Sequence, residues 1–314
     1  MVAAAFPTPS ADRPFRIGTR ASPLALAQAE LARGALIAAH GWRRDAVTLA
    51  PMTATGDRVQ DRALAEIGGK LLWTRELDRA LIAGGIDCAV HSLKDVETIR
   101  PADFVIAAML ERADPRDRLI GAAHIADLPH GATVGSASPR RAAQLLNRRR
   151  DLNIVLIRGN VATRLAKVAA GEADATLLAA AGLDRLGLGE TGHALDIDEM
   201  LPAPSQGAIG IETLAGHAGA RAALTAIDHA PTRRCVDAER ALLAALGGDC
   251  HSPVAAHARL RDNGGLILTA QLYTNDGSAM VAGEYMIDDD NTPEGLAHDL
   301  LDEAPPAIRA LFAG

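Results

Sequence analysis

Short apolar runs alternate with stretches of helical periodicity over most of the chain, and this order predicts an α/β fold. Leucine and alanine recur at three- and four-residue spacing between the apolar runs, which is typical of helices that pack on a sheet. The predicted strands are residues 15–19, 47–49, 86–90, 132–135, 154–157, 174–180 and 208–212.

One local pattern occurs twice along the chain. Residues 18–23 (GTRASP) and residues 135–141 (GSASPRR) each follow a strand with a glycine, a basic residue and a Ser-Pro pair. Serine is favoured as a helix N-cap and proline at the first helical position, so Ser22 and Ser138 are expected to open helices. The repetition predicts two similar α/β halves.

The pattern changes from about residue 230 onward. A helix over 234–246 is followed by alternating strands over 255–260, 266–273 and 280–286, with hairpin turn signals between them and a last helix over 293–301. These elements predict a small α+β domain. We expect a first domain of residues 14–112 plus 208–228, a second of 113–207, a linker over 202–207 and a C-terminal domain of 229–314.

A loop at residues 246–253 (LGGDCHSP) contains Cys250 between a carboxylate and an imidazole. Its glycines and proline predict a turn after the apolar helix, so the sulfur is expected at a surface. Two interpretations stay open from this pattern, a reactive thiol or a loop cysteine without a role. Cys88, by contrast, lies within an apolar run and is expected in a core.

Composition narrows the function classes. The net charge is −7 and aromatic residues are 3%, which disfavours a surface that stacks nucleic-acid bases. No apolar run approaches the roughly 20 residues of a membrane span. Three cysteines, no Cys-x-x-Cys or His-Glu-x-x-His motif and no secretory signal near the start predict a cytoplasmic protein without a metal.

Basic residues gather at predicted turns and first helical turns. A guanidinium binds a carboxylate with two hydrogen bonds, and a helix amino terminus adds N–H donors. Each residue alone is better explained by pairing with surface acids, but the set favours a polyanionic ligand. The set is Arg20, Arg140, Arg141, Arg158, Arg164 and Arg185.

Lys94 and Asp95 follow the third predicted strand, at the sheet edge where ligands bind in open α/β folds. A carboxylate there can transfer protons or stabilise a developing cation. An N-cap or a lysine-paired aspartate is an equally good explanation of the spacing.

Taken in order, these stretches resemble the porphobilinogen deaminase (hydroxymethylbilane synthase) family from about residue 15 to 258. The cysteine loop completes the resemblance. The other matching stretches are 18–25 (GTRASPLA), 68–70 (GGK), 91–95 (HSLKD), 114–117 (DPRD), 158–160 (RGN) with 163–164 (TR), 181–183 (AGL) with 185–187 (RLG), and 206–208 (QGA).

The resemblance implies a transferase of tetrapyrrole and haem biosynthesis. Four porphobilinogen molecules would be joined head-to-tail with loss of ammonia, on a dipyrromethane cofactor that Cys250 holds through a thioether, and released as hydroxymethylbilane. The implied fold has two similar periplasmic-binding-protein-like α/β domains and a smaller C-terminal α+β domain. A cytoplasmic monomer with no nucleic-acid or membrane partner is implied as well.

The resemblance also implies residue roles. Asp95 matches the catalytic carboxylate. Cys250, Lys94, Ser138, Arg140, Arg141 and Arg164 match residues that hold the cofactor, and Arg20, Ser22, Lys70, Arg158 and Arg185 match residues that contact substrate or the growing chain. The chain departs from the family pattern at Glu97, Asp249 and His251, where proline, glycine and glutamine are usual.

Two alternatives from other classes stay open. Two α/β halves around an anion site also describe a non-catalytic solute-binding protein, although the third domain counts against it. A cysteine hydrolase using Cys250 with His251 or His91 is disfavoured because adjacent residues seldom align as nucleophile and base.

Overall fold

The computed structural model describes residues 6–53 and 74–312, which divide into two compact units. Unit 1 contains the described residues up to Ala113 together with Ala208–Arg233. Unit 2 contains Asp114–Gly207 and the described residues from Arg234 onward. The chain therefore leaves the first unit and returns to it.

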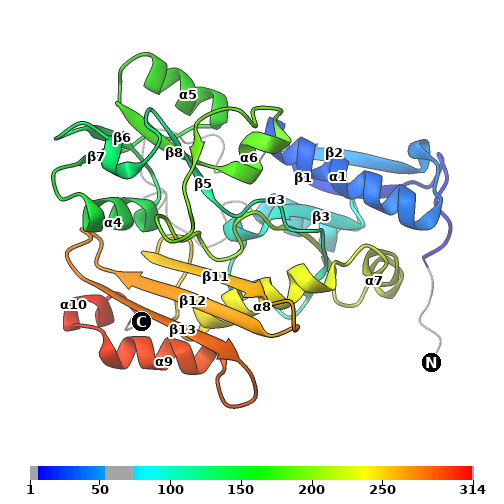
Figure 1. Ribbon diagram of the computed structural model, residues 1–314. Coiled ribbons are helices and arrows are strands. Elements are labelled where there is room, and N and C mark those ends of the chain that lie inside the picture. The colour runs from blue at the N-terminus through cyan, green and yellow to red at the C-terminus, as the bar shows by residue number, and fades with distance from the viewer. Residues whose placement is uncertain (1–5, 54–73, 313–314) are drawn as a thin grey trace. The chain divides into compact units, whose positions relative to one another are not determined.

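Unit 1 is built on a five-stranded sheet in the order β2-β1-β3-β10-β4 (Figure 1). The strands are β1 (Phe15–Arg20), β2 (Val47–Met52), β3 (Cys88–Ser92), β4 (Phe104–Met109) and β10 (Ile209–Leu214). The first three are parallel, and β10 runs antiparallel to β3 and β4. As predicted, the strand after residue 207 returns to the first sheet.

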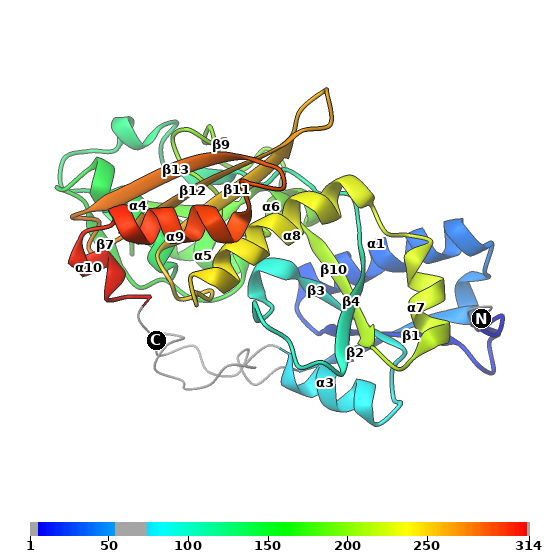
Figure 2. The ribbon, with the colours of Figure 1, turned by 90° about the horizontal axis from the view of Figure 1, so that it is seen from below.

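Helices cover both faces of this sheet. Alternate strand residues such as Ile17 pack against α1 (Pro23–His40) and α7 (Ala218–Thr225), whereas Leu77 of α3 (Arg75–Ile82) packs on the opposite face. Figure 2 shows α1 and α3 on opposite sides of the strands. Short 3₁₀ turns, η1 (Arg44–Ala46) and η3 (Leu93–Asp95), precede β2 and follow β3.

Unit 2 repeats the plan in its first sheet, ordered β7-β6-β8-β5-β9. As in unit 1, three neighbouring strands of the sheet, β7, β6 and β8, are parallel, and the next strand across the sheet, β5, is antiparallel to them. The strands are β5 (Asp117–Ile120), β6 (Thr133–Gly135), β7 (Asn153–Val155), β8 (Ala175–Ala179) and β9 (His193–Ala194), and the helical elements are η4 (Ile125–Asp127), α4 (Pro139–Arg148), α5 (Val161–Ala169) and α6 (Ala180–Arg185). The prediction of two similar α/β halves is confirmed.

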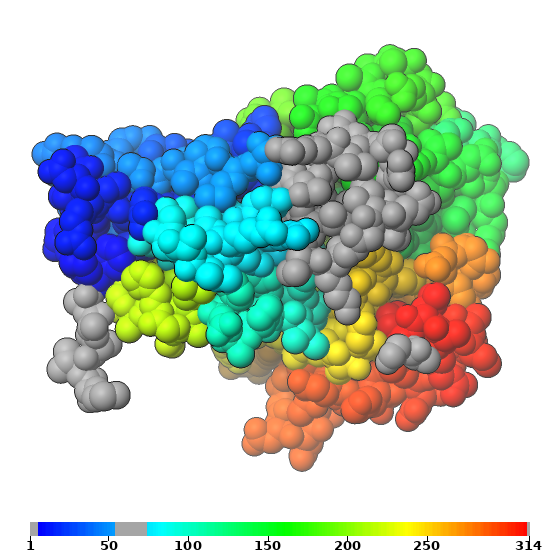
Figure 3. Space-filling view, turned by 180° about the vertical axis from the view of Figure 1, so that it is seen from behind, coloured from blue at the N-terminus to red at the C-terminus, as the bar shows by residue number. Residues whose placement is uncertain are grey.

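The rest of unit 2 is an antiparallel sheet of β11 (Val254–Leu260), β12 (Leu266–Tyr273) and β13 (Met280–Ile287). Its apolar face packs against α8 (Ala230–Ala245) and α9 (Pro293–Glu303), and α10 (Pro306–Arg309) follows. Figure 3 shows this layer from behind in yellow, orange and red. The predicted smaller C-terminal α+β region is confirmed.

The structure adds two features that the sequence did not predict. The segment predicted as a linker, residues 202–207, does join the two units, but it is almost entirely buried, and its Ser205 N–H donates to Glu239 of α8 at 2.6 Å. Strands β4 and β5 were not predicted at all. Residues 114–117 were interpreted as turn-like and as a candidate domain boundary; the described part of unit 2 does begin at Asp114, and β5 begins at Asp117.

Candidate active site

The turn that contains Asp95 is anchored by its first residue. Leu93 is fully buried and lies over Gly210 of β10, where an added Cβ would come within 2.3 Å of Leu93 Cδ2. The N–H of Leu93 donates to Ala208 O at 3.1 Å. With Leu93 fixed, the next two residues, Lys94 and Asp95, are half-buried at the carboxyl end of β3.

The residues just before this turn have polar partners of their own. Gln28 Nε2 of α1 donates to Ser92 Oγ at 2.8 Å. His91 is buried, and its Nε2 lies 3.3 Å from Oε2 of the fully buried Glu212. His91 is therefore a buried residue with a partner inside unit 1, and a catalytic partnership with Cys250 has no support.

Arg20 and Ser22 lie at the same sheet edge as Asp95, because β1 and β3 are parallel neighbours. Ser22 is the N-cap of α1, and its Oγ accepts from Ala25 N at 3.4 Å. Pro23 takes the first helical position, as predicted. Lys70 lies outside the described residues.

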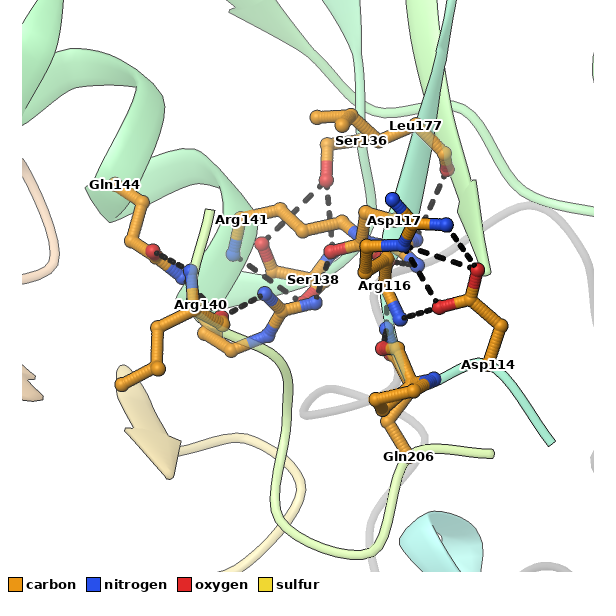
Figure 4. A network of polar contacts seen from close by, with 12 residues as sticks. Asp114, Arg116, Asp117, Ser136, Ser138, Arg140, Arg141, Gln144, Leu177 and Gln206 are labelled. Carbon is orange, nitrogen blue, oxygen red and sulfur yellow. Dashed lines mark hydrogen bonds and ion pairs between the residues drawn. The ribbon is translucent and has the colours of Figure 1, made fainter. Parts of the chain in front are cut away.

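In unit 2 the amino terminus of α4 presents Ser138, Arg140 and Arg141 (Figure 4). Ser138 is the N-cap and accepts from Arg141 N at 3.4 Å. Both guanidinium groups are buried and share one carboxylate: Arg140 Nη2 donates to Asp117 Oδ2 and Arg141 Nη2 to Asp117 Oδ1, each at 2.7 Å. Gln206 Nε2 adds a third donor at 2.8 Å from Oδ1.

The charge balance of this cluster is positive, because one carboxylate faces two guanidinium groups. Burial alone would raise the pKa of Asp117, but the attraction of Arg140 and Arg141 outweighs it and holds the pKa well below the ordinary value. Among the residues that the structure describes, Nε of Arg140 and Nε of Arg141 are buried without a hydrogen-bond partner. The cluster therefore has donors and positive charge left for an anionic ligand.

The remaining predicted arginines of unit 2 lie after neighbouring strands. Arg158 is buried after β7, and Arg164 Nε in α5 donates to Gly159 O at 3.0 Å. Arg185, at the end of α6, donates to Gly207 O at 2.7 Å, and burial lowers its pKa to about 10. Because β6, β7 and β8 are parallel, Arg140, Arg141 and Arg158 follow strands that end at one edge of the second sheet.

The cysteine loop begins where α8 ends. Gly247 adopts a left-handed conformation at φ 65°. The Oδ1 of Asp249 accepts from His251 N at 2.8 Å, and Ser252 Oγ accepts from Asp249 N at 3.0 Å, which closes a short turn around Cys250. Cys250 is an exposed thiol, whereas Cys88 is fully buried, and burial raises the pKa of Cys88 well above its ordinary value.

The part of the chain that the structure describes contains neither a metal-binding cluster nor a membrane-spanning helix. Within that part, no group of three or more His, Cys, Asp or Glu side chains is placed to hold a metal ion. None of the helices there has both the length and the apolar composition that a membrane crossing requires.

The sequence did not single out Asp117 or Gln206 as partners of the arginine cluster, although both lie in stretches that resemble the family. The signal was available for Asp117, since two adjacent arginines that open a buried helix require a nearby acid.

Two similar α/β halves with basic residues at helix amino termini, together with an exposed thiol in a third region, are features that favour the class of anion-binding proteins. Two family models match the chain. Residues 15–222 match "Porphobilinogen deaminase, dipyromethane cofactor binding domain", and residues 233–304 match "Porphobilinogen deaminase, C-terminal domain".

Curated relatives agree with the family models. The chain is 64% identical over 307 residues to the porphobilinogen deaminase of Sphingopyxis alaskensis, covering 96% of this chain and 98% of that protein. It is 50% identical over 279 residues to the porphobilinogen deaminase of Paracoccus denitrificans, covering 88% and 89%. A periplasmic substrate-binding protein of an ABC transporter from Coxiella burnetii matches at a TM-score of 0.41 and 15% identity, over 69% of this chain and 92% of that one.

The chain belongs to the porphobilinogen deaminase family. It is a transferase of tetrapyrrole synthesis with a dipyrromethane cofactor, and this family assignment is favoured over a non-catalytic solute-binding protein.

Proposed function

We propose that Asp95 is the catalytic carboxylate with which this chain joins four porphobilinogen molecules head-to-tail. In each addition the aminomethyl C–N bond of the substrate breaks, ammonia leaves, and a C–C bond forms to the acceptor pyrrole, which loses its α-proton. A carboxylate beside the substrate nitrogen stabilises the cation formed on ammonia loss and accepts that proton. The observation that carries this role is the anchored turn that holds Asp95 half-buried at the carboxyl end of β3.

We propose that Cys250 holds the dipyrromethane through a thioether. When bound, this cofactor would supply the terminal pyrrole carbon to which the first substrate unit is joined. The residues present fit the group: the sulfur is an exposed thiol, and unit 2 keeps two buried arginine N–H donors for carboxylates. Lys94, Ser138, Arg140, Arg141 and Arg164 are the residues proposed to bind its acetate and propionate groups.

The substrate and the growing chain carry the same acid groups. Arg20, Ser22, Lys70, Arg158 and Arg185 are proposed to bind them. Arg185, which the Gly207 carbonyl holds in place, supports this assignment, because a guanidinium held in place loses less conformational entropy when an anion binds.

The domain boundaries and the setting of the enzyme belong to the same proposal. Residues 14–112 with 208–228, residues 113–207 and residues 229–314 are proposed as three domains. A cytoplasmic monomer is part of the proposal; three widely spaced cysteines in the sequence support a reducing compartment.

The intact mass of the purified, denatured protein tests the proposal. We expect an adduct of two linked pyrrole units that disappears in Cys250→Ser. The matched control is Cys235→Ser, a buried thiol of α8, which should keep the adduct. An unmodified Cys250 in fully active protein would contradict the attachment.

Asp95→Asn separates the catalytic role from cofactor attachment. We expect turnover to fall by about 10²- to 10⁴-fold, the usual contribution of a general acid–base residue, while the adduct remains detectable. Turnover close to that of the unchanged enzyme would remove Asp95 from the mechanism.

A further inference from the structure

A buried cluster of charged side chains in unit 1 includes Glu97, which follows Asp95 by two residues. Its centre is Arg100, whose side chain is only 7% exposed and faces three carboxylates. Arg100 Nη2 donates to Asp78 Oδ1 at 2.6 Å, Nη1 donates to Glu97 Oε2 at 2.8 Å, and Nε donates to Glu212 Oε1 at 2.8 Å. One guanidinium therefore joins the first turn of α3, the segment after Asp95, and strand β10.

Glu97 links this cluster to the start of α3 as well. Thr74, the N-cap residue of α3, does not cap the helix with its side chain; its Oγ1 donates to Glu97 Oε1 at 3.0 Å. The Glu97 carboxylate thus accepts from two residues, Thr74 and Arg100, and its position is fixed from both sides. Arg100 is held from a further direction by the ring of Phe104, 4.8 Å from its guanidinium carbon.

The segment between His91 and Glu97 is consequently held at both ends. Before the turn, His91 pairs with Gly210 in the β3–β10 ladder, and Leu93 donates to Ala208 O. After the turn, only the buried Val96 separates Asp95 from Glu97. A shift of Glu97 would therefore be passed to Asp95 through the backbone of Val96.

The charges of this cluster are not those that would make the protein most stable. Three acids around one guanidinium leave excess negative charge in a buried place, and a buried ion pair is often no more stable than an apolar replacement. The cost is visible at Asp78, whose pKa is raised, first by burial and also by its acidic neighbours, although Arg100 opposes the rise. Burial alone would raise the pKa of Glu212 as well. The hydrogen bonds and charges of His91 and Arg100 outweigh burial, so the pKa of Glu212 is lowered.

We propose that Glu97, held by Arg100 and Thr74, is a positioning residue that fixes the Asp95 turn for the polymerisation reaction. This inference rests on the proposed catalytic role of Asp95. Glu97 acts through the backbone and through hydrogen bonds, so what matters is the carboxylate's ability to accept from Thr74 and Arg100.

Kinetics of the holoenzyme with porphobilinogen test this inference. Glu97→Ala removes both accepted hydrogen bonds, and we expect kcat to fall by about tenfold with KM changed by less than about twofold, because small misplacements of a reacting group cost rate. Glu97→Gln keeps an amide oxygen that can accept, so kcat should stay within about threefold of the unchanged enzyme. Glu97→Ala with unchanged kcat would overturn the proposal.

The matched control is an ion pair at the other end of β3. Arg16 Nε lies 3.3 Å from Asp87 Oδ2, and Asp87 immediately precedes the strand. Arg16→Met removes this pair near the same strand but away from Asp95. We expect kcat to be unaffected. If kcat instead falls as much as in Glu97→Ala, any loss of an ion pair in unit 1 slows the enzyme, and Glu97 has no specific role.

A second background distinguishes this inference from the proposed function. If Glu97 acts through Asp95, adding Glu97→Ala to Asp95→Asn should cause no further loss in the rate of adding the first pyrrole unit, followed by intact mass. A further tenfold loss would show that Glu97 acts independently and would overturn the inference. Near-normal turnover of Asp95→Asn alone would instead refute the catalytic assignment of Asp95.

Discussion

Asp117 determines the charge balance of the arginine cluster in unit 2. It is fully buried and is the carboxylate shared by Arg140 and Arg141, with Gln206 as a further donor. Without this acid, two guanidinium groups would lie buried side by side with only carbonyl oxygens as partners. Asp117 therefore keeps both arginines in place before any ligand binds.

Replacing Asp117 by Asn should destabilise the protein by about 3–5 kcal/mol at pH 7, since it leaves buried charges without a counter-ion. The effect should depend on pH in a defined direction. The folded-state pKa of Asp117 is lowered, so its contribution is complete above the unfolded value of about 3.9 and is lost as the pH falls from there through the folded pKa. Urea unfolding at several pH values measures both effects.

The control for Asp117 is Asp45→Asn. Asp45 also pairs with an arginine, Arg43, which lowers its pKa, but this pair is fully exposed. Water screens exposed pairs, so Asp45→Asn should leave the urea midpoint almost unchanged. Equal shifts of the urea midpoint for the two substitutions would contradict the role of Asp117. So would a difference in stability between Asp117→Asn and the unchanged protein that does not become smaller below pH 4.

At the scale of single residues, the sequence identified the basic members of the site better than their acidic partners. Arg140 and Arg141 stand out because they open a helix next to Ser-Pro, whereas Asp117 looked like part of a turn. Glu212 carried a clearer signal, because it is a charged residue inside an apolar strand and must find a buried partner there. Its partner Arg100 could not be found this way, since the contact spans 112 positions.

The repeated strand–glycine–Ser-Pro–helix pattern has a packing reason at the scale of elements. At Gly18 of β1 an added Cβ would lie 2.3 Å from Ile86 Cδ1, and at Gly135 of β6 it would lie 2.3 Å from Ile157 Cδ1. In both halves a neighbouring isoleucine fills the space beside the glycine. The glycine thus allows close packing at the sheet edge where the helix and its basic residues begin.

Gly135→Ala should destabilise the protein by about 1–3 kcal/mol through overpacking, because the new methyl would also approach Ile157 Cγ1 within 2.8 Å. Adding Ile157→Val, which removes the Cδ1 atom, should recover part of the loss. Chemical denaturation of both variants measures these changes.

Gly34→Ala is the matched control for the added methyl group. Gly34 is an exposed residue of α1 with nothing within 4 Å of an added Cβ. It should stabilise the protein by about 0.8–1.0 kcal/mol through helix propensity. A loss at Gly34 as large as that at Gly135, or no recovery from Ile157→Val, would show that the contact with Ile157 is not the cause.

Most elements could be predicted because they have either regular periodicity or explicit end signals. Ser22-Pro23 and Ser138-Pro139 mark the starts of α1 and α4, and the hairpin turns between β11, β12 and β13 contain glycines with left-handed backbone, Gly264 and Gly277. Strand β5 was missed because four residues with two charges have no alternating pattern. Its pairing with β8 and β9 is determined by tertiary contacts.

At the scale of the whole molecule, corresponding strands come from different parts of the chain. In unit 1 the antiparallel strand between β3 and β4 is β10, which follows unit 2's first sheet in sequence. In unit 2 the corresponding strand, between β8 and β9, is β5, the first strand of its sheet. The sequence predicted that the chain returns to the first sheet at residue 208. It did not predict that β5 is the counterpart of β10, because the two strands correspond only in the order of strands within each sheet.

Because each unit has its own core, breaking one antiparallel strand should unfold one unit and spare the other. Ile211→Pro removes an N–H from β10, which pairs with β3 and β4, so amide hydrogen exchange should accelerate in those strands while β6 and β8 stay protected. Leu119→Pro in β5 should give the reverse result. Equal loss of protection in both units for either variant would mean that the two units fold as one cooperative body.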